Sequence, residues 1–179
     1  MGKEEFKNPH PELPVREPIL KLGKMITDRV PIKLGFEKLT ADSPEYWGLA
    51  PICTDEQANI ALKMGVRKPK TLKQMVQITG MDEKELEKQL EQMSFNGLLE
   101  YNWENPQHEK QYVLPIFVPG SAEFSCMNAK MLEKHPELGI FFADFLEYLI
   151  KDDVIFITKL EHSLEELEDM VLEKGSTAS

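Results

Sequence analysis

The sequence is poor in cysteine and has no long hydrophobic run. Its 179 residues include two cysteines, Cys53 and Cys126, whereas a secreted disulfide framework normally carries more. No apolar stretch approaches the roughly 20 residues of a membrane helix. The chain also does not open with a charged and then apolar signal peptide, because Lys3, Glu4 and Glu5 lead into a proline-rich stretch. These absences predict a cytoplasmic protein.

Motifs for catalysis and for metal binding are also missing. There is no GxSxG, P-loop, GxGxxG, CxxC or HExxH pattern. A lone cysteine nucleophile would need a positioned base, and Cys126 has the surroundings of a small core residue. We therefore assign no catalytic, cofactor-binding or metal-binding residue, and we expect no catalytic activity in this chain alone. A cysteine–histidine pair formed in the fold stays open, because the histidines are scattered: His10, His108, His135 and His162.

The charge balance is strongly acidic. Thirty-one Asp and Glu residues face 21 Lys and Arg residues, which gives a formal net charge of -10. An acidic surface repels phosphate backbones and anionic lipid heads, so nucleic acid and membrane are disfavoured as partners. Solubility alone is the plainer explanation of the acidity. Hydrophobic residues make up 41% of the chain, which is enough for a packed core.

Three regions follow from proline content and hydrophobic periodicity. Residues 1–20 form an extended proline-rich arm, residues 21–119 a winged helix-turn-helix domain with its lead-in, and residues 120–179 a helical extension. A brief helix is expected from Ile19 to Ile26. Residues 31–51 have the proline and glycine punctuation of a loop, which Tyr46 and Trp47 pin to the core. The predicted fold class is mainly α with a small β-hairpin (α+β).

Capping residues mark the three helices of the central domain. Thr54 and Thr71 are suitable N-caps for the first two, and Asp82 with Glu85 forms a capping-box pattern for the third. Ala58, Ala61, Leu62 and Met64 are expected to form the buried side of the first helix. Residues 98–103 and 110–114 then have the pattern of a hairpin. This order is that of a winged helix-turn-helix, and a three-helix bundle followed by a hairpin is the alternative.

The extension is expected to be mostly helical. One helix should run from Ser121 to Met131, and Pro136 should stand near the start of another. Residues 154–157 are predicted to form a strand, and Ser163 with Glu166 to open a last helix. The helix after Pro136 is apolar over a wide arc, which indicates either packing across the central domain or an interaction surface. That candidate surface comprises Phe141, Phe142, Phe145, Tyr148 and Leu149.

The third helix of the domain would be the DNA-reading helix of a winged-helix regulator. It carries five acidic residues against two lysines, Lys84 and Lys88, a surplus of three negative charges: Asp82, Glu83, Glu85, Glu87 and Glu91. Phosphate contacts supply most of the affinity for DNA, so this helix should repel a duplex. The candidate weak nucleic-acid patch, which is more simply a solvated loop, comprises Arg67, Lys68, Lys70 and Lys73.

The chain resembles the N-terminal winged-helix region of 4Fe-4S ferredoxin-domain oxidoreductase-type proteins of anaerobic bacteria. The residues that carry the resemblance are 54–58, the helices up to Gly97, and the stretch from Lys110 through 115–120 to Glu123-Phe124-Ser125 and the Phe-rich helix. The resemblance implies an electron-transfer setting. In that family the cluster-binding cysteines follow a segment like 154–174, and no position here matches them. We expect either a piece of a longer cluster-binding protein or a shortened relative.

The favoured function is a non-catalytic winged-helix module for protein interaction or scaffolding, associated with a 4Fe-4S electron-transfer oxidoreductase. Its partner would be a redox protein or an iron-sulfur domain, and the clusters would lie in that partner or in a parent protein. The alternative is a winged-helix transcriptional regulator that binds DNA, as a dimer, through the Arg67–Lys73 patch. An enzyme with a dispersed site is the third hypothesis, and a homodimer is left open.

Overall fold

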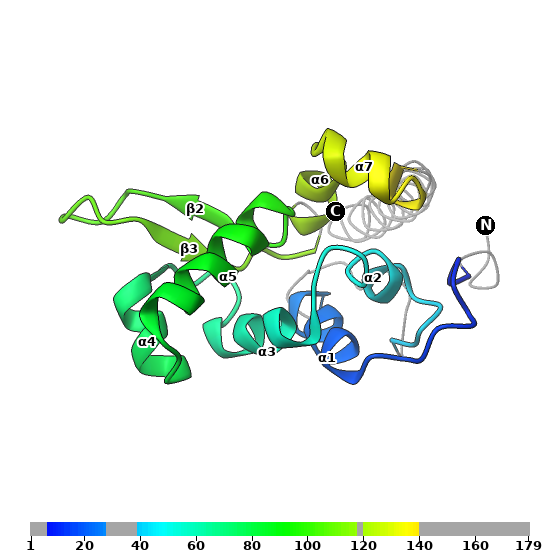
Figure 1. The fold of residues 1–179 in the computed structure, drawn as a ribbon, viewed down its shortest axis with the longest axis horizontal. Helices are drawn as coiled ribbons and strands as arrows, with labels where there is room; N and C mark the ends of the chain where they lie inside the picture. The colour runs from blue at the N-terminus through cyan, green and yellow to red at the C-terminus, as the bar shows by residue number, and fades with distance from the viewer. Residues whose placement is uncertain (1–6, 28–38, 118–119, 140–179) are drawn as a thin grey trace, which may run out of the picture. The chain divides into compact units, whose positions relative to one another are not determined.

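The computed structural model describes residues 7–27, 39–117 and 120–139. This part of the chain is mainly helical and contains a small antiparallel sheet of three strands (Figure 1). Its helices are α1 (Glu17–Thr27), α2 (Pro44–Trp47), α3 (Asp55–Met64), α4 (Leu72–Thr79), α5 (Glu83–Phe95), α6 (Ser121–Cys126) and α7 (Ala129–Lys134). Its strands are β1 (Lys70–Thr71), β2 (Glu100–Asn102) and β3 (Gln111–Val113). No described helix is both long and apolar enough to cross a membrane.

The predicted starts of α3, α4 and α5 are confirmed. The Thr54 and Thr71 hydroxyls accept hydrogen bonds from the backbone N–H groups of Gln57 and Gln74. The Gln57 and Gln74 side-chain oxygens accept in turn from the backbone N–H groups of Thr54 and Thr71, which completes a capping box at each helix. Asp82 caps α5 by accepting from the backbone N–H groups of residues 84 and 85. The capping box predicted for Asp82 and Glu85 is not formed, because the Glu85 carboxylate accepts a hydrogen bond from the Gln89 side chain, one turn further along α5. Each cap satisfies donors that the first turn of a helix leaves unpaired.

The sheet has one strand more than the sequence predicted. β3 is the central strand and pairs antiparallel with both β1 and β2, so the order is β1-β3-β2. β2 and β3 are the expected hairpin, with Tyr101 opposite Tyr112, and this hairpin extends away from the helices (Figure 1). β1 consists of Lys70 and Thr71 immediately before α4. It ties the turn between α3 and α4 to the hairpin.

One part of the core lies among α3, α4, α5 and the sheet, and α1 and α2 extend it on the other side of α3. The inner face of α5 is fully buried, with Leu86, Leu90 and Met93 at 0% exposure. The buried side of α3 was predicted with one error, since Leu62 is half-buried and Ile60 is buried in its place. Burial of such side chains contributes about 1.5–3 kcal/mol each, so it dominates the stability of the domain.

The N-terminal part is more ordered than an extended arm. α1 begins at Glu17, inside the range predicted for the arm, and packs against α2 and α3. α2 interrupts the predicted loop, because Pro44 occupies its first turn, where the missing donor costs little. Tyr46 and Trp47 on α2 are 4% and 8% exposed, which confirms that they pin this segment to the core.

The helix predicted from Ser121 to Met131 is in fact two helices. α6 ends at Cys126, and the Asn128 side chain then caps α7 by accepting from the backbone of residues 130 and 131. An asparagine that bonds to the following backbone favours the start of a new helix over continuation. The apolar surface at 141–149, the strand at 154–157 and the last helix lie outside the described residues.

Candidate interaction surface

Three glutamates form a row on the outer side of α5. Glu83, Glu87 and Glu91 follow one another at intervals of four residues, which places them on one face of the helix, and all three are exposed. We call these residues the glutamate row. Phe95 continues it by one more turn and is 53% exposed. The acidic surplus predicted for this helix therefore lies on its solvent side.

The hairpin is fastened to the end of this row by Glu91. The Lys110 ammonium lies 2.5 Å from a Glu91 carboxylate oxygen, and the Tyr112 hydroxyl donates a hydrogen bond to the same oxygen. The ammonium also lies 4.4 Å from the centre of the Tyr101 ring, within the range of a cation–π contact. We call Glu91, Lys110 and Tyr112 the hairpin contact.

The hairpin contact shifts the titration of its members. Burial alone would raise the pKa of Glu91, but the hydrogen bonds from Lys110 and Tyr112, with the Lys110 charge, outweigh it and lower the pKa. The pKa of Tyr112 is raised by burial, by its bond to Glu91 and by the negative charges of Glu91 and Glu87. The hydrogen bond from Tyr112 to Glu91 places the end of the glutamate row beside the hairpin.

The predicted basic patch surrounds the start of α4. Arg67 and Lys68 lie in the turn before β1, Lys70 lies on β1, and Lys73 lies in the first turn of α4. Lys70 is half-buried, and the other three are exposed. One Arg67 nitrogen lies 3.8 Å from a Glu100 carboxylate oxygen. The four cations thus lie near the junction of β1 and α4, and one of them, Arg67, is close to a carboxylate on β2.

An apolar patch lies beyond the glutamate row. Phe95 at the end of α5, and Phe124 and Met127 at the end of α6, are 53%, 37% and 81% exposed and border one shallow hollow. The Asn128 side-chain amide donates to the Phe95 carbonyl oxygen at 2.5 Å, and the Lys130 ammonium lies 5.8 Å from the Phe95 ring centre. Because Phe95 lies four residues after Glu91, the sequence places it next to the glutamate row on α5. The sequence gives no such signal for Phe124 and Met127, which reach the patch only through the packing of α6 on α5.

Gly97 explains how α5 and α6 come so close. Its φ is +86°, in the region that favours glycine. A Cβ at this position would lie 2.6 Å from the carbonyl carbon of Phe124 and would also clash with the backbone nitrogen of Ser125. The end of α5 therefore packs directly on the α6 backbone.

The cysteines and histidines occupy separate places. Burial raises the pKa of Cys53 to about 12, and burial also raises the pKa of the half-buried Cys126 thiol, which donates to the Leu138 carbonyl at 3.3 Å. His10 and His135, remote in sequence, both approach Glu137. Within residues 7–27, 39–117 and 120–139, no group of three or more His, Cys, Asp or Glu side chains is arranged to hold a metal ion.

Comparisons with known proteins add no relative to this picture. A scan against protein-family models, a search of curated proteins and a search of solved structures each return no match.

Proposed function

We propose that this chain is a non-catalytic winged-helix module that binds another protein, in the setting of a 4Fe-4S electron-transfer oxidoreductase. The observation that carries the proposal is the exposed glutamate row on the hairpin side of α5. In winged-helix regulators the corresponding helix enters the DNA major groove. Here that face carries carboxylates, which repel a polyanion and attract a basic protein surface.

The order of elements supports a winged helix. α3, β1, α4, α5, β2 and β3 follow one another, and the sheet order is β1-β3-β2. In this assignment α4 and α5 are the helix-turn-helix pair, and the β2–β3 hairpin is the wing. The hairpin contact holds the wing against α5, so the two elements present one surface.

The partner surface implied by this geometry has an apolar centre and a basic rim. The apolar patch supplies the area from which water can be displaced, and the glutamate row supplies charge that steers and orients the partner. The iron-sulfur identity of the partner depends on the family resemblance alone. The candidate surface at 141–149 would extend the interface, and it lies outside the described residues.

A charge-reversal variant tests the proposal. Tagged wild-type protein, retrieved from native lysate, should bring down a protein that contains acid-labile sulfide. The Glu83→Lys, Glu87→Lys double variant should retrieve less of it, because two carboxylates of the glutamate row are replaced by cations. Both residues are exposed, so the fold should tolerate the change. The matched control is Glu56→Lys with Glu133→Lys, which changes the net charge equally at exposed sites on α3 and α7. Equal retrieval by both double variants would refute a role for the glutamate row.

The basic patch favours a second candidate, a DNA-binding regulator. Arg67, Lys68 and Lys73 are exposed, so they could contact a phosphate backbone. We expect no shift of a duplex by wild-type protein in low salt. Tight binding that weakens steeply with added salt, and that disappears when these three residues become glutamine, would replace the first proposal with this one.

A further inference from the structure

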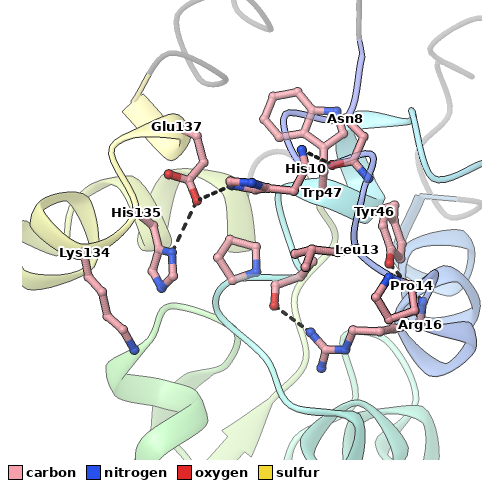
Figure 2. A pocket seen from close by; sticks show the side chains of 12 residues that line it. Asn8, His10, Leu13, Pro14, Arg16, Tyr46, Trp47, Lys134, His135 and Glu137 are labelled. Carbon is pink, nitrogen blue, oxygen red and sulfur yellow. Dashed lines mark hydrogen bonds and ion pairs between the residues drawn. The ribbon is translucent and has the colours of Figure 1, made fainter.

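A pocket lies between the N-terminal segment and the residues that follow α7. Its volume is about 330 Å³, at the lower end of the range for small-ligand sites. Figure 2 shows Lys134 and His135 on one side and Leu13, Pro14 and Tyr46 on the other. Because these segments lie more than a hundred residues apart, the pocket exists only in the folded chain.

One side of the pocket is apolar. Leu13, Pro14, Trp47 and Pro51 contribute to it, and Leu13 is 58% exposed. The polar ends of the two aromatic side chains are already engaged. The Tyr46 hydroxyl accepts a hydrogen bond from the Arg16 backbone at 2.9 Å, and the Trp47 indole donates to the Asp42 carbonyl at 3.3 Å. Because Tyr46 and Trp47 are almost fully buried, Leu13, Pro14 and Pro51 supply most of the carbon surface that a ligand could contact.

The opposite side offers free hydrogen-bonding capacity for an anion. Nδ1 of His135 lies 3.3 Å from a Glu137 carboxylate oxygen, which is also 3.7 Å from Nε2 of His10. Nε2 of His135 is buried and has no hydrogen-bond partner among the described residues. Lys134, its neighbour in sequence, is exposed and pairs with no carboxylate of residues 7–27, 39–117 or 120–139. Both groups border the same space.

Arg16 stabilises the pocket and is not available to a ligand. Its guanidinium donates to a carboxylate oxygen of Asp55 at 2.7 Å, to the Ala50 carbonyl at 2.8 Å and to the Cys53 carbonyl at 2.7 Å. The guanidinium thus fixes the N-terminal segment on the loop between α2 and α3. The cations that remain for recognition are Lys134 and a protonated His135.

The geometry points to a binding site for a small aromatic carboxylate in this pocket. The apolar side receives the ring, and the ligand carboxylate lies between the Lys134 ammonium and Nε2 of His135. Since Nδ1 of His135 donates its proton to Glu137, Nε2 can donate to the ligand only after it takes up a proton. Glu12, 3.5 Å from Nδ1 of His10, and Glu137 are the negative groups nearby. The site is independent of the interaction surface on α5.

Fluorescence of Trp47 measures the binding. A Trp103→Phe background leaves Trp47 as the only tryptophan, and Trp103 is half exposed on the hairpin, away from the pocket. Phenylacetate should give a saturable change below about 10 mM and should bind at least about tenfold more tightly than neutral 2-phenylethanol or cationic phenethylamine. His135→Gln should weaken phenylacetate binding, because the ligand carboxylate then loses its partner at Nε2.

A pair of lysine variants separates specific from general charge effects. Lys134→Met should weaken phenylacetate binding about fivefold or more, whereas Lys130→Met, on the same helix but outside the pocket, should not. Three results would each overturn the assignment: no saturable response to phenylacetate, equal binding of phenylacetate and 2-phenylethanol, or equal affinities of the two lysine variants.

Discussion

Glu45 on α2 carries a carboxyl group that the fold encloses completely. The residue is 0% exposed, and neither carboxylate oxygen makes a well-formed hydrogen bond within the described part of the chain. Burial raises the pKa of Glu45 above its usual value of 4.5, while its own backbone and the Thr27 hydroxyl lower it to a smaller extent. An ionised carboxylate in such a place destabilises the folded state.

The sign of the pH dependence follows from this shift. When pH rises from 4.5 through the raised pKa of the folded state, the folded protein holds a proton that the unfolded chain has released. The contribution of Glu45 to the free energy of unfolding is therefore fully present below 4.5 and falls across that window. A Glu45→Gln variant does not titrate. It should be more stable than wild type above the window by about 1–3 kcal/mol, the usual penalty for an uncompensated buried polar group.

Urea unfolding followed by tryptophan fluorescence, at a series of pH values, measures this difference directly. For a chain of this size a gain of 1 kcal/mol corresponds to about 2–4 °C in melting temperature. Glu56→Gln on the exposed side of α3 is the control and should leave stability unchanged within about 0.5 kcal/mol. A stability difference between Glu45→Gln and wild type that is absent at high pH, or that is the same on both sides of the window, would refute this account of Glu45.

Three further predictions concern other parts of the molecule. Gly97→Ala should lower the free energy of unfolding by more than about 3 kcal/mol, because the new Cβ would meet the α6 backbone. Gly80→Ala, with φ +73° and open space around it, should lower it by about 1–2 kcal/mol. Chemical denaturation compares the two variants, and similar losses would contradict the packing described at Gly97. Lys110→Met should release the hairpin, lower stability by about 1 kcal/mol or less and speed amide exchange over residues 100–113, while Lys68→Met should not. With a pKa of about 12, the Cys53 thiol is about one part in a hundred thousand thiolate at about pH 7, so in a Cys126→Ser variant a thiol reagent should modify it only after unfolding. Rapid labelling of the folded protein would be the contrary result.

Local signals allowed most of the central helices to be predicted. Thr54, Thr71 and Asp82 act within one turn of themselves, so their capping role is visible in sequence. β1 was not predicted because two residues, Lys70 and Thr71, are too few to show the alternation of apolar and polar residues that marks a strand. They form a strand only by pairing with β3. Asn128 is a capping residue that could have divided the helix from Ser121 to Met131, but the apolar pattern around it favoured a single helix.

The sites were less predictable than the fold. The glutamate row follows from spacing alone, and the structure adds only that its face adjoins the hairpin. The pocket could not have been predicted, because His10 and His135 are 125 residues apart and meet at Glu137 only when the N-terminal segment folds back on α2. The burial of Glu45 gives no sequence signal either, since an acidic residue in the first turn of a helix is ordinarily exposed.

The contact of Gly97 with α6 joins two helices backbone to backbone. No side chain lies between them at this point to absorb a displacement, so a partner that moves the end of α5 must move α6 with it. Phe95 and Phe124 consequently keep a fixed spacing, and a partner that bound there would meet a rigid shape. Binding would cost little conformational entropy in this chain, because this side of the interface is already ordered. The selectivity of the surface would then depend on how well the shape of a partner fits it.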